Sequence, residues 1–346
     1  MQAVVLRETG PADNLRLEHI DPPELSAGHV LVRVHAAGVC YRDVIDRQGG
    51  FPFMKKPVVP GHEFAGEVAS VADDVTELEV GDRVTNLHRA PCGECDYCLA
   101  GHGPRCSRSL FMFGLTADGG YAEVVAAPVG ALVKLPDAIS YDSSCFLACT
   151  AGVALRGMRT RGGLGEGESV LITGASGGVG LHAIQVAKAL GARVIAVTSS
   201  EAKKEALEKF GAEVIVSADL AFHKLVKGMT DGGVNVVLDC VGAPTLNASI
   251  RSVKPMGRVV VAGNVTIARH EVNPGYMILN EVALLGTSGC TRDDLSTVLD
   301  WVVQGKLEPV IADRLALKDA AKAHRRLEAR GVIGRLVLQP SRGSTL

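Results

Sequence analysis

The stretch Thr173-Gly-Ala-Ser-Gly-Gly-Val-Gly180 decides the fold of the second half of the chain. An apolar run, Ser169–Thr173, leads into it, and a run with helical spacing, Leu181–Leu190, leads out. A strand, a glycine turn and a helix together present free N–H groups and a positive helix dipole, which suit a pyrophosphate. The spacing is G-x-x-G-x-x-G, not the commoner G-x-G-x-x-G. Such a turn alone also fits an ordinary loop, but its flanks favour dinucleotide binding.

From about residue 168 onward, strand-like and helix-like runs alternate, which indicates a parallel, doubly wound sheet. The expected strands are 170–173, 194–198, 214–217, 234–239 and 258–263, with a sixth at 282–285. The expected helices are 179–190, 201–210, 221–229 and 245–253.

The first 135 or so residues differ from this pattern, because short apolar or alternating runs are separated by Gly and Pro turns. They predict a β-rich region, with strands at 30–34, 64–69 and 121–125. The tail predicts helices at 292–304 and 317–329 and a last strand at 334–338.

The end of the second expected strand bears on cofactor choice. An acidic residue there, about 20 positions after the glycine turn, would bind the ribose of NAD. The chain instead has hydroxyls and lysines, which favour NADP(H), although Glu201 argues the other way and Ser199 or Ser200 could simply cap a helix. The candidate cofactor-binding residues are Gly174, Ser176, Gly177, Gly178, Val179, Gly180, Thr198, Ser199, Ser200, Lys203, Gly263 and Asn264.

Four of the nine cysteines lie close together, as Cys92, Cys95, Cys98 and Cys106. The pattern C-x2-C-x2-C-x7-C suits a closed tetrahedral zinc site of structural type. An iron–sulfur cluster is the alternative metal. A nucleic-acid-binding zinc ribbon is disfavoured because the nearby arginines are offset by Glu94 and Asp96, leaving no basic stripe.

A second set of candidate metal ligands is spread along the chain. Cys40, His62 and Cys149 would form a Cys2His site with an open position, which is the catalytic arrangement for zinc. Glu63 could be a fourth ligand or a neighbour of the ligands, and Asp43 could orient His62 through its other ring nitrogen. Taken singly, each residue also fits an ordinary buried position.

Composition narrows the class of protein. The 346 residues suggest two domains, and a net charge of −2 gives no reason to expect nucleic acid or a membrane as partner. Neither a signal peptide nor a membrane-spanning run is recognisable, so we expect a cytoplasmic protein that acts on a small molecule.

Together these residues resemble the zinc-containing medium-chain dehydrogenase/reductase superfamily, and within it the alcohol dehydrogenase family. The resemblance rests on Cys40-x-x-Asp43, Gly61-His62-Glu63, Val80–Val84, the four cysteines, Gly119–Glu123, Cys149 and the glycine turn. It implies an α/β protein with a GroES-like β-rich catalytic domain (1–150, with a zinc lobe at about 86–110, and again 287–346) and a Rossmann domain (151–286). It further implies a catalytic zinc on Cys40, His62 and Cys149, a structural zinc on the four cysteines, and a homodimer or homotetramer.

Two residues depart from the usual family pattern. Arg42 stands where a Ser or Thr usually passes the substrate proton, and Ile45 stands where a His is often present. With the glycine turn and the LHAIQV segment after it, Cys40-Tyr-Arg-Asp43 looks most like NADPH-dependent acryloyl-CoA reductases.

Two enzymatic hypotheses follow. In the first, hydride adds to a carbonyl carbon, as in alcohol dehydrogenases. In the second, hydride adds to the β-carbon of an enoyl-CoA thioester, and zinc or Arg42 stabilises charge on the thioester oxygen. Arg42 favours the second, because a fixed cation cannot relay a proton at neutral pH. An inactive NADPH-binding protein is the non-enzymatic alternative, and the complete set of catalytic-type ligands argues against it.

Overall fold

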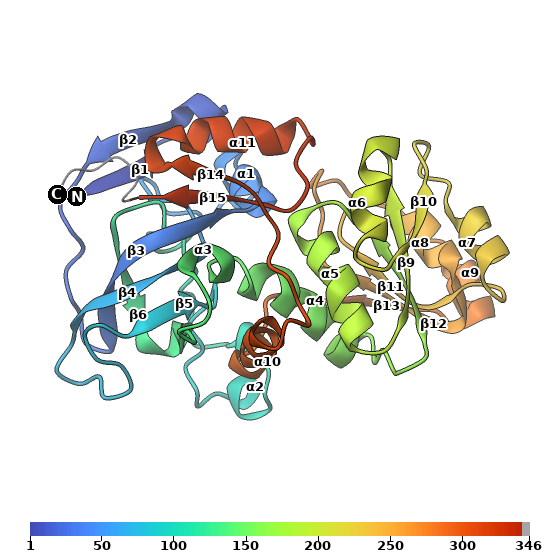
Figure 1. The fold of residues 1–346 in the computed structure, drawn as a ribbon, viewed down its shortest axis with the longest axis horizontal. Helices are drawn as coiled ribbons and strands as arrows, with labels where there is room; N and C mark the ends of the chain where they lie inside the picture. The colour runs from blue at the N-terminus through green and yellow to red at the C-terminus, as the bar shows by residue number, and fades with distance from the viewer. Residues whose placement is uncertain (341–346) are drawn as a thin grey trace. The chain divides into compact units, whose positions relative to one another are not determined.

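The computed structural model describes residues 1–340, and the chain divides into two compact units (Figure 1). Unit 1 comprises Met1–Cys149, Gly289–Val303 and the chain from Pro309 onward. Unit 2 comprises Thr150–Ser288 and Gln304–Glu308. The chain thus leaves unit 1 directly after Cys149. Over residues 1–340, none of the helices has the length and apolar character needed to cross a membrane.

Unit 1 is built on a seven-stranded sheet in which most neighbours are antiparallel. The strand order is β14-β15-β3-β4-β5-β7, with β6 also paired to β3. The strands are β3 (His29–Val39), β4 (Phe64–Val71), β5 (Arg83–Asn86), β6 (Val124–Pro128), β7 (Leu132–Lys134), β14 (Ile311–Ala316) and β15 (Arg335–Gln339). A separate antiparallel pair is formed by β1 (Gln2–Leu6) and β2 (Leu15–His19).

The helices of unit 1 are short, apart from two in its C-terminal part. They are α1 (Tyr41–Arg47), α2 (Asp96–Leu99), α3 (Tyr141–Ser144), α10 (Arg292–Val303) and α11 (Ala320–Glu328). Short 3-10 turns are η1 (Ala12–Asn14), η2 (Gly103–Arg105), η3 (Val129–Ala131) and η7 (Leu317–Asp319).

Strand β3 is the centre of unit 1, because it pairs with β4, β6 and β15. Its side chains Val30, Val32 and Val34 alternate into the main hydrophobic core, as expected for a strand with one buried face. Cys40 follows directly after the last residue of β3, so the core fixes where this cysteine lies.

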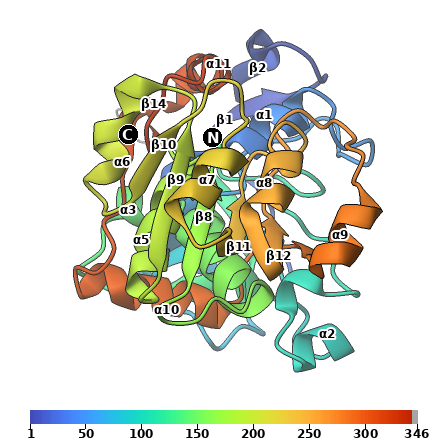
Figure 2. The ribbon, with the colours of Figure 1, turned by 90° about the vertical axis from the view of Figure 1, so that its right-hand side faces the viewer.

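Unit 2 is a six-stranded parallel sheet of order β10-β9-β8-β11-β12-β13. Figure 2 shows β10, β9, β8, β11 and β12 side by side. The strands of the sheet are β8 (Ser169–Thr173), β9 (Arg193–Thr198), β10 (Glu213–Val216), β11 (Val234–Asp239), β12 (Val253–Val261) and β13 (Ala283–Gly286). Helical segments are α4 (Val153–Leu155), η5 (Arg156–Arg161), α5 (Gly178–Ala189), η6 (Glu201–Lys203), α6 (Lys204–Glu208), α7 (His223–Met229), α8 (Leu246–Ser252) and α9 (Pro274–Asn280). The α/β class, with a GroES-like sheet unit and a parallel Rossmann-like unit, is confirmed.

The predicted strand at 121–125 is wrong at its start. The strand is β6, Val124–Pro128, and Tyr121 lies before it. Gly119 and Gly120 let this segment approach the loop at residues 59–61 closely, and their N–H groups donate to the Val59 and Gly61 carbonyls. The segment therefore pairs with that loop and with β1 instead of continuing the pairing of β6 with β3.

Two further boundaries differ from the prediction. The expected helix at 201–210 is split into η6 and the short α6. Strand β12 begins at Val253, earlier than expected, and ends at Val261, so Gly263 and Asn264 lie beyond it. A register shift against β11 between Val234 and Val236 accommodates the longer strand.

Candidate active site

Four potential metal ligands of unit 1 come together in space. Cys40 precedes α1, His62 and Glu63 precede β4, and Cys149 lies in the π-helical turn η4 (Ala148–Gly152). One ligand atom from each lies within 4.8 Å of all the others. Cys40, His62 and Glu63 are buried and Cys149 is half-buried.

The His62 ring is oriented by a neighbouring carboxylate. Nδ1 lies 2.7 Å from Oδ1 of Asp43, while Nε2 lies 3.4 Å from Sγ of Cys149. A carboxylate can only accept, so we assign the proton of the neutral ring to Nδ1. The Nε2 lone pair is then available to a metal ion, as in the carboxylate–histidine–zinc arrangement.

The surroundings of the site favour a thiolate on Cys40 and a cation on His62. A hydrogen bond from the Cys149 thiol holds the pKa of Cys40 well below its usual range, against the effect of burial. Burial opposes charge on His62, but the Asp43 carboxylate outweighs it and raises the pKa of His62 to about 10. A metal ion must therefore displace a proton from His62 at neutral pH.

Glu63 has a charged partner that the sequence did not reveal. Nε of Arg335 donates to Oε2 of Glu63 at 3.1 Å, and Nη2 donates to Oε1 in a second, short contact. Burial raises the pKa of Glu63 to about 7, although the Arg335 charge acts in the opposite direction. Arg335 directly precedes the apolar run Leu336–Leu338 and is the one cation in β15, which was a usable signal. No sequence pattern, however, shows that β15 pairs with β3.

Arg42 forms its ion pair with Asp46, while Glu63 is paired with Arg335. Nε of Arg42 lies 3.0 Å from Oδ2 of Asp46, one helical turn further along α1, and its guanidinium lies over the Phe51 ring at 5.9 Å. Over residues 1–340, Nη2 of Arg42 and Oδ1 of Asp46 are buried and form no hydrogen bond. The side chain therefore keeps a donor for a further group.

These residues fit a zinc ion. Two thiols, an imidazole and a carboxylate are the donors that zinc accepts, and their ligand atoms already lie close enough to share one ion. Because Glu63 is engaged by Arg335, three of the four remain as free donors, which leaves one position open.

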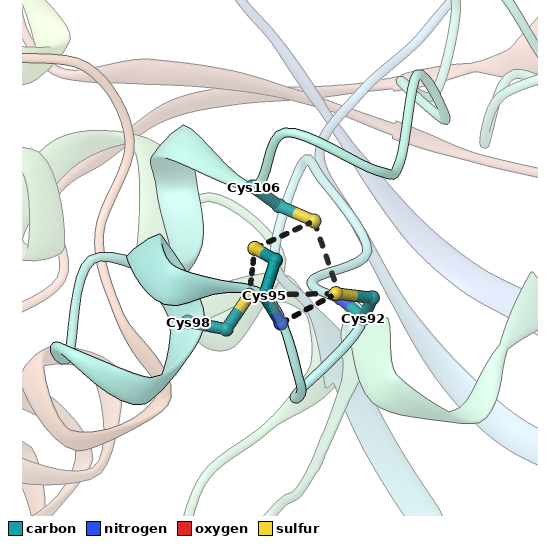
Figure 3. A group of neighbouring side chains, drawn as sticks. All are labelled: Cys92, Cys95, Cys98 and Cys106. Carbon is teal, nitrogen blue, oxygen red and sulfur yellow. Dashed lines mark hydrogen bonds between the residues drawn. The ribbon is translucent and has the colours of Figure 1, made fainter.

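The four clustered cysteines also converge (Figure 3). Sγ of Cys95 lies 3.5 Å from Sγ of Cys98 and 3.9 Å from Sγ of Cys106, and the Cys92 and Cys98 sulfurs are 3.9 Å apart. Thiolates around one tetrahedral zinc are about 3.8 Å apart, given Zn–S bonds of about 2.3 Å. None of the four forms a disulfide.

Backbone donors support thiolates in this lobe. The N–H groups of Cys92 and Ser109 point to Sγ of Cys106, and the N–H of Cys95 points to Sγ of Cys92. Hydrogen bonds led by the Ser107 backbone lower the pKa of Cys95 to about 5. All four positions are filled by protein, so the lobe suits a structural ion and offers no open position.

In unit 2, the glycine turn connects β8 to α5. Gly174 has φ +59, and a Cβ on Gly180 would lie 2.6 Å from Cα of Ala175. Both positions therefore require glycine. Gly177 is the N-cap, no side chain caps α5, and its first turn has no acidic residue. Gly178, Val179 and Gly180 open the helix, so their N–H groups are available to phosphate oxygens.

The end of β9 approaches this turn. Nζ of Lys203 donates to Oγ of Ser176 at 3.4 Å. Oγ1 of Thr198 is buried and accepts from the Ser200 N–H, and Ser199 is exposed. The alternative cap role is not seen for Ser200, which is the N-cap of η6 but forms no side-chain cap hydrogen bond.

Gly263 and Asn264 lie beside the end of β11. A Cβ on Gly263 would meet the Cys240 carbonyl carbon at 2.9 Å, and the Asn264 side chain donates to the Ala268 carbonyl. Buried Asp239 at the end of β11 ties this edge to β8, because it accepts from Thr173 at 2.9 Å and from the Gly242 N–H. The predicted cofactor-binding residues of the turn, β9 and β12 all lie at carboxyl ends of strands or just beyond them, where ligands bind in such sheets.

Comparison with known proteins agrees with this architecture. Residues 26–137 match the family model of the alcohol dehydrogenase GroES-like domain, and residues 178–304 match that of zinc-binding dehydrogenases. These two models together define a zinc-dependent oxidoreductase that uses a nicotinamide cofactor.

Relatives of known name span the whole chain. Acryloyl-coenzyme A reductase of Metallosphaera sedula is 38% identical over 98% of this chain and 99% of its own length. The enzyme of the same name from Sulfurisphaera tokodaii is 37% identical, over 98% and 100%. The crystal structure of AibC superposes with a TM-score of 0.92 at 45% identity, covering 98% of this chain and 95% of that one. The chain therefore belongs to the zinc-containing medium-chain dehydrogenase/reductase superfamily, in the alcohol dehydrogenase family.

Proposed function

We propose that the protein uses NADPH to reduce a carbon–carbon double bond conjugated to a CoA thioester, with an acryloyl-CoA-like substrate. The observation that carries the proposal is Arg42, which stands where the family usually has a proton-passing hydroxyl. Its buried Nη2 donor has no hydrogen-bond partner among residues 1–340. The full-length similarity to two acryloyl-coenzyme A reductases supports the same substrate class.

Site chemistry follows from the residues of unit 1. A zinc ion on Cys40, His62 and Cys149 would supply an electrophile for the thioester oxygen. Hydride addition at the β-carbon would place negative charge on the thioester oxygen, and a proton from water would then add to the α-carbon. The nicotinamide, when bound, would supply the hydride. Arg42 donates a charge-assisted hydrogen bond to that oxygen through Nη2, while Asp46 holds its Nε.

The alternative is reduction of an aldehyde or ketone, or oxidation of an alcohol. That reaction needs a route for a proton to or from the substrate oxygen, and both usual relay positions are occupied by groups that cannot supply one, Arg42 and Ile45. The alternative therefore lacks the relay residues that the family usually provides for this proton transfer.

A substrate panel tests the proposal. NADPH consumption is followed with acryloyl-CoA, crotonyl-CoA, aldehydes and ketones, before and after removal of the open-site metal. We expect turnover of enoyl-CoA and its loss with the metal. Turnover of aldehydes without enoyl-CoA would reject the proposed substrate, and full activity after verified metal removal would reject the metal's role.

NADPH preference is part of the proposal. The end of β9 carries no carboxylate to bind a free ribose hydroxyl, and Lys203 reaches the glycine turn through Ser176. We expect Lys203→Ala to raise the KM for NADPH about tenfold or more and to change that for NADH little. Lys204→Ala is the control, because Lys204 faces Glu208 at 3.9 Å on the exposed side of α6. Equal effects of both variants, or a wild-type preference for NADH, would contradict this assignment.

We also propose that the protein is a homodimer or homotetramer. Strand β13 is an edge strand of the unit 2 sheet, and α9 beside it in the chain exposes Ile278 and Leu279 to 75% and 85%. Large apolar side chains next to an edge strand favour association. Light scattering that shows a monomer at assay concentration would exclude it.

A further inference from the structure

The metal ligand His62 is connected to residues far along the chain by a run of buried hydrogen bonds. Asp43 accepts from His62 on Oδ1, and on Oδ2 it accepts from the Cys40 N–H at 3.1 Å and the Tyr121 hydroxyl at 3.3 Å. The Tyr121 oxygen in turn lies 3.3 Å from Nε2 of His324 on α11. Because the Asp43 carboxylate can only accept hydrogen bonds, it fixes the donor-to-acceptor direction of every bond in the run.

Protonation states are fixed by burial. Tyr121 and His324 are both fully buried. Burial raises the pKa of Tyr121 well above its usual value, so the hydroxyl keeps its proton and donates it to Asp43. Burial lowers the pKa of His324 to about 4, so the ring is neutral, and its Nε2–H donates to the Tyr121 oxygen. Nδ1 of His324 is then the bare nitrogen, and over residues 1–340 it has no hydrogen-bond partner.

Tyr121 is held from several sides. Its N–H donates to the Pro60 carbonyl at 3.0 Å, and its own carbonyl accepts from the Val4 N–H at 2.8 Å. Gly61 lies against its ring, since a Cβ there would meet the aromatic carbons. The His324 ring meets the Tyr121 ring edge-on, with centroids 6.0 Å apart. These contacts fix the position of the Tyr121 hydroxyl.

We propose that Tyr121 and His324 are positioning residues of the metal centre, which hold the Asp43 carboxylate so that His62 keeps Nε2 turned toward Cys149. Every donor in the run points toward Asp43, which fixes the orientation of the carboxylate and so holds Nδ1–H of His62 in place. The inference rests on the metal site proposed above and on no particular substrate.

The test measures zinc affinity without substrate, by competition with a chelator. Loss of a direct partner of a metal-bound histidine lowers metal affinity about 10–100-fold, and a contact one step further should lie at the lower end, at about tenfold for Tyr121→Phe. The four-cysteine zinc is an internal control and should keep its affinity. Cobalt substitution adds a second readout, because a changed His62 geometry shifts the d–d bands of the open site.

A matched pair at His324 separates positioning from packing. His324→Gln retains a donor near the place of Nε2, whereas His324→Leu removes it and keeps an apolar side chain. Positioning predicts that the Leu variant binds open-site zinc more weakly, by several-fold, and that the Gln variant recovers most of the affinity. A packing role predicts the reverse, because Leu suits a buried site better.

Results that overturn the inference are distinct from those that overturn the function. Zinc affinity within twofold of wild type and an unchanged cobalt spectrum in folded Tyr121→Phe would refute positioning, whatever the substrate is. If Cys149→Ser retained the wild-type metal count, the metal site itself would be wrong.

Discussion

Glu63 is held between potential metal ligands and a cation. Its oxygens receive two hydrogen bonds from Arg335, and Oε1 lies 3.7 Å from Nε2 of His62. Both members of the ion pair are buried. Gly38 on β3 leaves room for the carboxylate, because a Cβ there would collide with Glu63. A charge so placed needs its partner, since neither side chain can reach bulk water.

Removal of Arg335 should therefore be costly. We expect Arg335→Met to lower the free energy of unfolding by about 3–5 kcal/mol, because it leaves a buried carboxylate unpaired. The exposed pair Arg193–Glu213, with an N–O distance of 2.6 Å, is the matched control, and Arg193→Met should change stability by less than about 1 kcal/mol. Denaturant unfolding measures both. Similar losses of unfolding free energy in the two variants would show that the burial of Glu63 is not the cause of the destabilisation.

His324 predicts a pH dependence of stability. Its folded pKa of about 4 lies below the usual 6.5, so between these values the unfolded chain binds a proton that the folded chain does not. The contribution of neutral His324 to the free energy of unfolding is fully present above about pH 6.5. It falls by up to about 1.4 kcal/mol per pH unit as the pH drops toward 4.

Thermal unfolding checks the sign. Between pH 6.5 and 5, the melting temperature of His324→Gln should fall less than that of the wild type, because glutamine does not titrate. Parallel melting curves across this range would contradict a neutral, buried His324.

At the scale of elements, the glycine turn shows what local sequence can predict. The strand, turn and helix from Ser169 to Ala189 lie within about one residue of their predicted positions, because Gly174 and Gly180 are required by backbone geometry inside the turn itself. Helix α1 was not expected, although Asp43, at its third position, accepts from the Cys40 N–H as in a capping box.

Substitution within the turn should test its role. Gly180→Ala places a Cβ against Ala175 and pushes α5 away from the turn, so we expect at least a tenfold loss of NADPH affinity, measured by fluorescence titration. Gly228→Ala in α7 has open space around it and should leave affinity unchanged and stability equal or slightly higher. NADPH binding at wild-type strength by Gly180→Ala would show that the turn does not hold the pyrophosphate.

The two cysteine sites should be separable by metal content. Cys98→Ser should remove the four-cysteine zinc and destabilise the lobe, and Cys149→Ser should remove the open-site zinc, so each loses about one metal per chain. Elemental analysis of purified protein measures this. A single metal in the wild type, or loss of both from either variant, would contradict two independent sites.

At the scale of the whole molecule, contacts between distant segments were the part that sequence could not show. Cysteine spacing and strand–helix alternation are local patterns, and they predicted the candidate four-cysteine site and the parallel sheet. Arg335, Tyr121 and His324 reach the site only because β15 pairs with β3, the segment before β6 pairs with residues 59–61, and α11 packs against α1. The spacing of residues along the chain does not predict these long-range contacts.

The most direct test of the proposed reaction is to identify the substrate carbon that receives the hydride. NADPH carrying deuterium at the transferred position of C4 is incubated with acryloyl-CoA, and the product is analysed by mass spectrometry and NMR. The account predicts propionyl-CoA with one deuterium on its β-carbon. Unreacted acryloyl-CoA, together with an alcohol labelled on its carbinol carbon when an aldehyde is supplied, would contradict it.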